Sequence, residues 1–172
     1  MTDFLQLAKE RFSVRQFAPT PVEKEKLDLI LEAGRVAPTA KNNQPQKVYV
    51  LQTPEQLAKI RSVCPCAYNA PLVLVIGYDN DRDWKNNLQP GYHSGETDAA
   101  IVCTHMMMEA WDLGIGSCWV GWFNAQEVHE TLGLPANVTV TALLPLGYIP
   151  EGGKASGNHL AIRPAEDTIV YL

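Results

Sequence analysis

The sequence predicts a single domain in which helices alternate with the strands of one sheet that is covered on both faces. A chain of 172 residues with 46% hydrophobic and 19% charged content fits one globular core. Segments with helical periodicity alternate with segments rich in Val, Ile, Leu and Tyr. Leu72 to Ile76 is continuously apolar, which is typical of a strand buried on both faces. We therefore expect one domain spanning residues 1–172.

Four shorter helices are expected from their start and stop signals. Asp3 to Glu10 predicts a first, short helix. Thr20-Pro21-Val22-Glu23 reads as a capping box with proline at the first helical position, and Pro38 prevents the helix that follows it from continuing. The same device precedes helices that end near Val63 and near Leu132 and Gly133, at Thr53-Pro54-Glu55-Gln56 and at Asn124-Ala125-Gln126-Glu127.

A fifth helix, from Thr97 to Leu113, is predicted to be the longest, and most of its circumference is apolar. Its polar side chains fall in one narrow stripe: Asp98, His105, Glu109 and Asp112. A monomer of this size has difficulty covering the rest, so we expect one face to pack on the core and another on a second copy of the chain. A central core helix in a monomer is the alternative.

The predicted strands are Lys47 to Leu51, Leu72 to Tyr78, Val138 to Leu146 and a short C-terminal Thr168 to Tyr171. The polar stretch from Asp79 to Glu96 predicts a long loop, of the kind that often carries function.

Composition excludes several classes of function. A formal net charge of −5 argues against nucleic acid or an anionic membrane surface as the main partner. No apolar run is long enough to cross a membrane and the start does not resemble a signal peptide, so a cytoplasmic protein is expected. The four cysteines are expected to be free thiols, with Cys118 buried, and the scattered histidines predict no metal site.

Positive charge is concentrated near the start of the chain. Residues 1–61 hold ten of the fourteen Lys and Arg against seven acids, whereas residues 62–172 hold four against twelve. Arg11, Ser13 and Arg15 alternate with Phe12 and Val14, so extended backbone would present two guanidinium groups and a hydroxyl on one side. This set suits a phosphomonoester, although surface arginines near a helix end are the commoner explanation.

Two further segments are candidates for ligand contact. Ala37 to Pro45 places three carboxamides and Thr39 between two prolines, a set suited to the edge of a planar heterocycle, although a surface turn would also explain it. Ser117 to Phe123 places Trp119 and Trp122 around Gly121, where a backbone N–H could approach a flat ligand; ordinary core packing is the alternative.

Taken together, these motifs resemble the FMN-dependent nitroreductase family, and most of all its short members. The resemblance rests on Arg11-x-Ser13-x-Arg15, Ala33 to Pro45, Gly114 to Gly121, Leu146-Gly147-Tyr148 and Arg163 to Asp167, in that order. It implies an α+β, three-layer α-β-α sandwich with a mainly antiparallel or mixed sheet, in an intertwined homodimer that holds FMN in two interface pockets.

The resemblance also implies roles for residues. Arg11, Ser13 and Arg15, with Phe12 beside them and Arg163 assisting, would hold the phosphate and ribityl chain. Pro38, Thr39, Ala40 and Asn42 would reach the flavin of the other subunit, with Gln44 supporting their loop, and Trp119, Val120 and Gly121 would face the ring near N5. Gln46 and Ile162 depart from the family pattern, and Lys154 is a candidate to replace the basic residue missing at Ile162.

The implied activity is transfer of hydride from NADH or NADPH through the flavin to a small acceptor, such as a nitroaromatic, a quinone or a flavin. Catalysis would occur at the cofactor, so no catalytic side chain is expected. A specialised relative such as a reductive dehalogenase, and a dimer that binds FMN without turnover as a carrier or sensor, are the alternatives.

Overall fold

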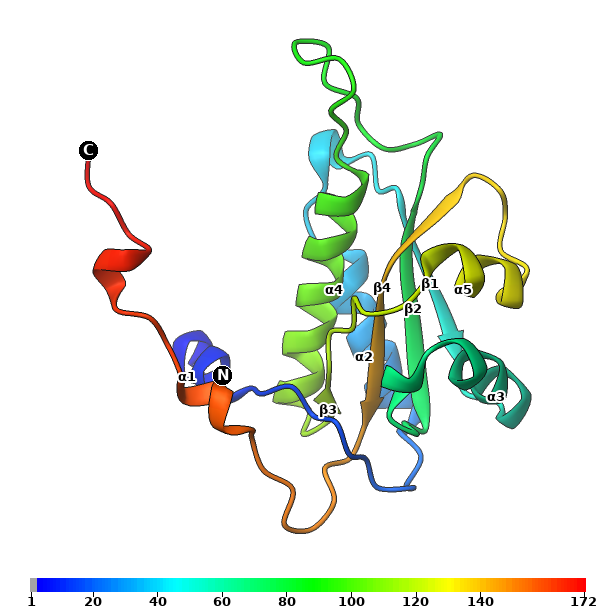
Figure 1. The fold of residues 1–172 in the computed structure, drawn as a ribbon, viewed down its shortest axis with the longest axis vertical. Helices are drawn as coiled ribbons and strands as arrows, with labels where there is room; N and C mark the ends of the chain where they lie inside the picture. Colours follow the sequence, from blue (N-terminus) through cyan, green and yellow to red (C-terminus); the bar gives the residue numbers. More distant parts are fainter. Residues whose placement is uncertain (1–2) are drawn as a thin grey trace.

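The computed structural model describes residues 3–172, which form five α-helices, four strands and four short 3-10 helices (Figure 1). The α-helices are α1 (Phe4–Glu10), α2 (Lys24–Arg35), α3 (Pro54–Val63), α4 (Gly95–Asp112) and α5 (Ala125–Leu132). The strands are β1 (Gln46–Leu51), β2 (Leu72–Asp79), β3 (Gly116–Ser117) and β4 (Val138–Gly147). The 3-10 helices are η1 (Ala40–Asn42), η2 (Pro65–Ala67), η3 (Gly157–Leu160) and η4 (Ala165–Asp167).

The strands form one antiparallel sheet in the order β1-β2-β4-β3. All eight residues of β2 are buried, so the continuously apolar run predicted to be central is central. A bulge between Ile76 and Gly77 leaves Thr141 without an opposite residue in β2. A side chain at Gly77 would meet the backbone oxygen of Thr139 at 2.3 Å, which explains the glycine.

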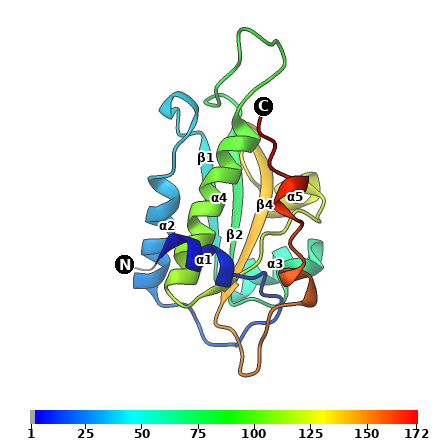
Figure 2. The same cartoon turned by 90° about the vertical axis from the view of Figure 1, so that its left-hand side faces the viewer.

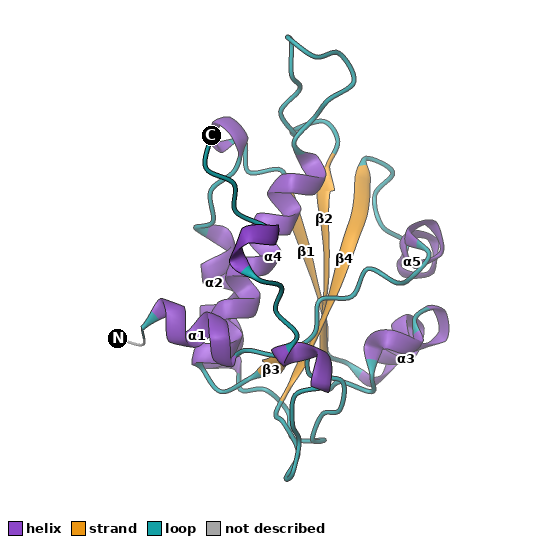
Figure 3. Ribbon diagram, turned by 60° about the vertical axis from the view of Figure 1, so that its left-hand side comes forward, coloured by secondary structure: helices purple, strands orange, loops and turns teal. Residues whose placement is uncertain are grey.

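Helices cover both faces of the sheet, as the sequence predicts (Figures 1 and 3). On one face α2 and α4 pack over a core that includes Leu74 and Leu144. On the other face α3 and α5 pack over a second core that includes Val75 and Leu143. The protein is therefore an α+β, three-layer sandwich. None of the helices within residues 3–172 has the length and apolar content needed to cross a membrane.

The capping devices at Thr53 and Asn124 are confirmed, because Thr53 caps α3 in a full capping box and Asn124 accepts two backbone N–H groups at the start of α5. The predicted box at Thr20 is wrong. Helix α2 begins at Lys24, and the Glu23 carboxylate accepts a hydrogen bond from Tyr148 Oη at 2.6 Å instead of capping the chain at Thr20.

Three other expectations need correction. The predicted strand at Thr168 to Tyr171 is irregular and exposed, because no strand of the described chain lies beside it to accept its hydrogen bonds. Helix α4 starts two residues before Thr97, at Gly95. Asp98 does not belong to an exposed polar stripe, since it is 2% exposed.

Candidate functional site

The segment from Arg11 to Arg15 runs extended from the end of α1 and lies beside β3. Val14 donates its backbone N–H to Ser117 O at 2.9 Å, and its side chain is 3% exposed. Phe12 packs edge-on against Trp111 of α4, with ring centroids 5.1 Å apart. Arg15 is exposed and donates from Nη1 to Ser13 O at 3.3 Å. The buried residues thus fix this segment while Arg15 stays free to reach a ligand.

A cleft of about 360 Å³ opens along this segment. One wall is formed by residues 12–16, which include Ser13 and Arg15. The other wall is the loop after β4 and carries Ile149, Gly152, Gly153, Lys154 and Ser156. Arg15 and Lys154 therefore place two cations around one cleft, which Ser13 also lines. Arg11 is half-buried and lies outside the residues that line the cleft, and Arg163 is exposed in the C-terminal segment.

The segment from Ser117 to Gly121 runs along the edge of β4 that lies away from β2. Val120 and Leu143 exchange both backbone hydrogen bonds, at 2.9 and 3.0 Å. Ser117 Oγ is buried and has no hydrogen-bond partner among the described residues. Gly121 is exposed, with open space where a side chain would begin, and Trp119 is half-buried against the α2 and α4 core. The backbone at Gly121 is thus accessible, as the glycine predicts.

The thiol of Cys118 is buried, as predicted, between the cleft and the second core. Burial raises the pKa of Cys118, and the nearby Arg15 and Ser13 side chains oppose that shift only in part. Because the Cys118 thiol stays neutral, it does not offset the positive charge of Arg15. That charge remains available to an anion.

The loop from Pro38 to Pro45 is held in an unusual backbone conformation. Lys41, Asn42 and Gln44 have φ of 52°, 55° and 50°, values that L-residues other than glycine rarely adopt. Thr39 Oγ1 accepts the backbone N–H of Gln44 at 3.1 Å, and Gln44 Nε2 donates to Asn42 O at 3.4 Å. Each left-handed residue costs about 1–3 kcal/mol, so surrounding contacts must hold this loop in place. Such strain is frequent at ligand sites.

Asp98 supplies one of these contacts, and the sequence did not single it out as a site residue. Its Oδ1 accepts the backbone N–H of Ala40 at 2.9 Å, and its Oδ2 accepts from Ser94 Oγ at 2.7 Å. An acidic residue in the first turn of a helix ordinarily reads as a favourable partner of the helix dipole. The signal that was available is Ser94, which stands at the N-cap position of α4, four residues before Asp98.

The segments that line the cleft and the loop from Pro38 to Pro45 lie at opposite ends of α4 (Figure 1). The loop is bonded to Asp98 in the first turn of α4, whereas Ser117 follows the last turn of the same helix. A helix of 18 residues is about 27 Å long. One chain therefore does not bring its own Asn42 and Gln44 to its own Ser13 and Arg15.

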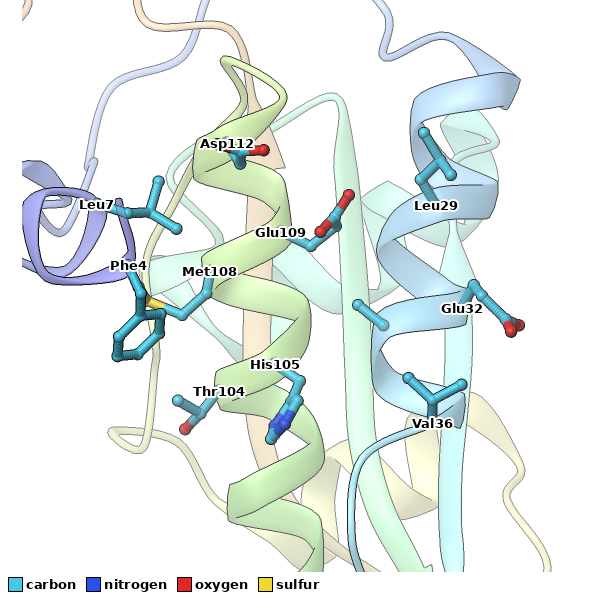
Figure 4. A pocket seen from close by; sticks show the side chains of 11 residues that line it. Phe4, Leu7, Leu29, Glu32, Val36, Thr104, His105, Met108, Glu109 and Asp112 are labelled. Carbon is cyan, nitrogen blue, oxygen red and sulfur yellow. The ribbon is translucent and has the colours of Figure 1, made fainter. Parts of the chain in front are cut away.

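Beside α4 lies a groove of about 620 Å³ whose walls come from α1, α2 and α4 (Figure 4). Apolar side chains are unusually exposed there, with Phe4, Leu29 and Val36 at 70%, 50% and 62%. Thr104, His105 and Met108 form the floor on α4. The exposed apolar side chains of the groove come from α1, α2 and the residue after α2. The apolar side chains of α4 are themselves buried or half-buried within one chain, so the predicted excess of apolar surface lies beside α4 and not on it.

Helices on both faces of an antiparallel sheet define an α+β protein, and two cations, Arg15 and Lys154, line its cleft. The model of the nitroreductase family matches residues 8–67 and 63–148. The chain belongs to the nitroreductase family. A nitroreductase family protein from Clostridium difficile 630 has a TM-score of 0.92 and 34% identity, over 99% of this chain and 98% of that one.

Other relatives carry names that describe redox enzymes. A putative NADH dehydrogenase/NAD(P)H nitroreductase from Archaeoglobus fulgidus is 29% identical, over 86% of both chains. An FMN reductase (NAD(P)H) from Bacillus subtilis is 30% identical, over 86% of this chain and 66% of that protein. A putative nitroreductase in complex with FMN from Desulfovibrio desulfuricans, at 23% identity over 100% and 98% of the two chains, shares the fold with a TM-score of 0.82.

Proposed function

We propose that this chain is an FMN-dependent oxidoreductase that takes hydride from NADH or NADPH and delivers it to a small acceptor. The observation that carries the proposal is the cleft that places Arg15, Lys154 and Ser13 around one space. Two cations and a hydroxyl match the charge and the acceptor oxygens of a phosphomonoester. When bound, the flavin would supply the hydride chemistry at N5.

This chain's residues would bind and orient the cofactor. Arg15 and Lys154 would neutralise the phosphate, and Ser13 would donate to it or to the ribityl chain. The accessible backbone at Gly121 would face the ring. The names of two relatives, which mention FMN and NAD(P)H, support FMN as the cofactor and NAD(P)H as the hydride donor. The proposed acceptors are nitroaromatics, quinones or flavins.

The proposed active form is a homodimer. Because α4, which is about 27 Å long, separates the loop from Pro38 to Pro45 from the cleft, the loop would contribute to the cleft of the second subunit. The exposed apolar side chains of the groove support burial of this face against a second copy (Figure 4). Sedimentation velocity tests this point, since Leu29→Glu on the groove should yield a monomer that has lost FMN, whereas a fully dimeric Leu29→Glu protein contradicts it.

Flavin loading tests the function as a whole. The purified protein should bind FMN, and anaerobic NADH or NADPH should bleach the flavin absorbance. Replacing both Arg11 and Arg15 by Ala should abolish FMN binding and leave the dimer intact, since neither change touches the groove. A protein that does not take up FMN refutes the proposal, and a flavoprotein that neither nucleotide reduces is a carrier or sensor instead.

A further inference from the structure

Residues 80–94, here called the finger, project beyond the N-terminal end of α4 (Figures 1 and 2). Lys85 pairs with His93 in an antiparallel bridge, and Asn86 donates its N–H to Tyr92 O at 2.9 Å. The rings of Trp84 and Tyr92 lie edge to face, with centroids 6.4 Å apart. The finger is thus an ordered hairpin-like segment with aromatic side chains.

The finger and the loop from Pro38 to Pro45 are joined by a buried chain of hydrogen bonds. Trp84 donates its backbone N–H to Ser94 Oγ at 3.1 Å, and the same hydroxyl donates to Asp98 Oδ2 at 2.7 Å. The other oxygen of Asp98 accepts from Ala40 N at 2.9 Å. Ser94 and Asp98 are 4% and 2% exposed. Each end of this chain is a backbone group, so it fixes the two main chains relative to each other.

A second link joins the finger and the loop from Pro38 to Pro45 at the surface. Asn43 Nδ2 donates to Arg82 O at 3.1 Å, and the Asn43 side chain is exposed. If Asp98 served only the helix dipole, a carboxylate at the surface of the first turn would suffice. Burial of both oxygens on partners from two different loops indicates a positional role, because a buried carboxylate is costly unless its bonds are made.

We propose that Ser94 and Asp98 are positioning residues that lock the finger to the flavin loop, so that FMN held by the loop stabilises the finger as the wall for a flat aromatic acceptor. This rests on the proposed function. Contacts to Asp98 and Arg82 help to hold the left-handed residues of the loop, so a ligand that favours this loop conformation also favours the finger bonded to it. Tyr92 and His93 line a hollow of about 480 Å³ on the finger, which suits a planar ring.

Limited proteolysis of the dimeric protein with trypsin tests the coupling without relying on activity. Arg82 and Lys85 are exposed cleavage sites within the finger. In the wild-type protein FMN should slow cleavage there about tenfold or more. This magnitude is that of one hydrogen bond to a charged group, here the bond from Ser94 to Asp98 that couples the finger to the loop. In Ser94→Ala, which leaves the Ala40 contact with Asp98 in place, FMN should still bind and the protection should fall below about twofold. Equal protection in both proteins overturns the proposal.

One control, a second variant and a kinetic measurement make the result specific. Ser62→Ala removes an exposed hydroxyl on α3, bonded only within its own helix, and should behave as the wild type. Asn43→Ala breaks the exposed second link and should reduce the protection in part, so the coupling stays testable if Ser94→Ala fails to fold. In Ser94→Ala the KM for a quinone should rise about tenfold while turnover with ferricyanide, which needs no wall, is unchanged.

The outcomes separate the two proposals. A wild-type protein that does not bind FMN overturns the proposed function and this inference with it. A wild-type protein that binds FMN and is cleaved in the finger at the same rate with and without it keeps the function and overturns the inference.

Discussion

The cleft makes a quantitative prediction about how Lys154 contributes to FMN affinity. A cation and a phosphate oxygen 4 Å apart attract each other by about 1 kcal/mol in water and about 4 kcal/mol at the effective dielectric near a protein surface. Lys154 is exposed in a cleft open to solvent, so the lower part of this range applies. We expect Lys154→Ala to cost about 1–2 kcal/mol, which is about a 5- to 30-fold rise in the Kd for FMN.

Fluorescence titration with FMN and with riboflavin separates this effect from loss of folding. Riboflavin lacks the phosphate, so Lys154→Ala should leave its Kd unchanged within about twofold. The FMN effect should shrink in 1 M salt, where the screening length falls to about 3 Å. Lys59→Ala is the matched control, because it removes the same charge from α3, where Lys59 pairs with Glu55 and does not line the cleft. The phosphate does not lie in this cleft if Lys154→Ala raises the Kd for riboflavin as much as the Kd for FMN. The same conclusion follows if Lys59→Ala raises the Kd for FMN as much as Lys154→Ala does.

Three further predictions concern the fold that carries the site. Leu143→Ala should lower the free energy of unfolding by about 2–5 kcal/mol in urea titrations, because the side chain is fully buried; a loss below about 1 kcal/mol would contradict that packing. Burial raises the pKa of Cys103 to about 12, so iodoacetamide at pH 8 should modify the half-buried Cys66 first and Cys103 only after unfolding, as read by mass spectrometry; equal rates would contradict this. The hydrogen bond from Tyr148 lowers the pKa of Glu23, so the stability that it contributes is present above the ordinary value of 4.5 and is lost as the pH falls through the lower folded value. Tyr148→Phe should accordingly destabilise the protein at pH 7 and show a smaller difference from the wild type below pH 4.5, and a difference independent of pH would refute this assignment.

Local signals predicted those parts of the fold that local physics determines. The run at Leu72 to Ile76 is buried because both faces of its strand are covered, and a pattern confined to a few residues reveals that. The side chains of Thr53 and Asn124 cap their helices by accepting backbone N–H groups of residues two or three positions later in the chain. The start of α2 could not be found in this way, since the partner that draws Glu23 away from capping is Tyr148, 125 residues further along the chain.

The candidate site shows the same division. Alternation predicted that Val14 and Arg15 would point to opposite sides, and Val14 is buried whereas Arg15 is exposed. Arg11, predicted to lie beside Arg15, is not among the residues that line the cleft. Lys154 joins Arg15 only because β4 returns the chain to the cleft, so its place depends on the whole sheet. Asp98 was placed in the polar stripe of its helix, and helical periodicity does not reveal that the loop at Ala40 folds over that turn. Contacts between segments 58 residues apart need the tertiary structure.

The length of α4 has a genetic consequence. Because it separates the loop from the cleft within one chain, a chain carrying Arg15→Ala and a chain carrying a disabled Asn42 loop would be defective at different places in the proposed dimer. A mixed dimer of the two would pair one intact loop with one intact cleft and place both lesions in the other site. Two inactive alleles should therefore complement each other, and co-expression should restore up to one working site in each mixed dimer.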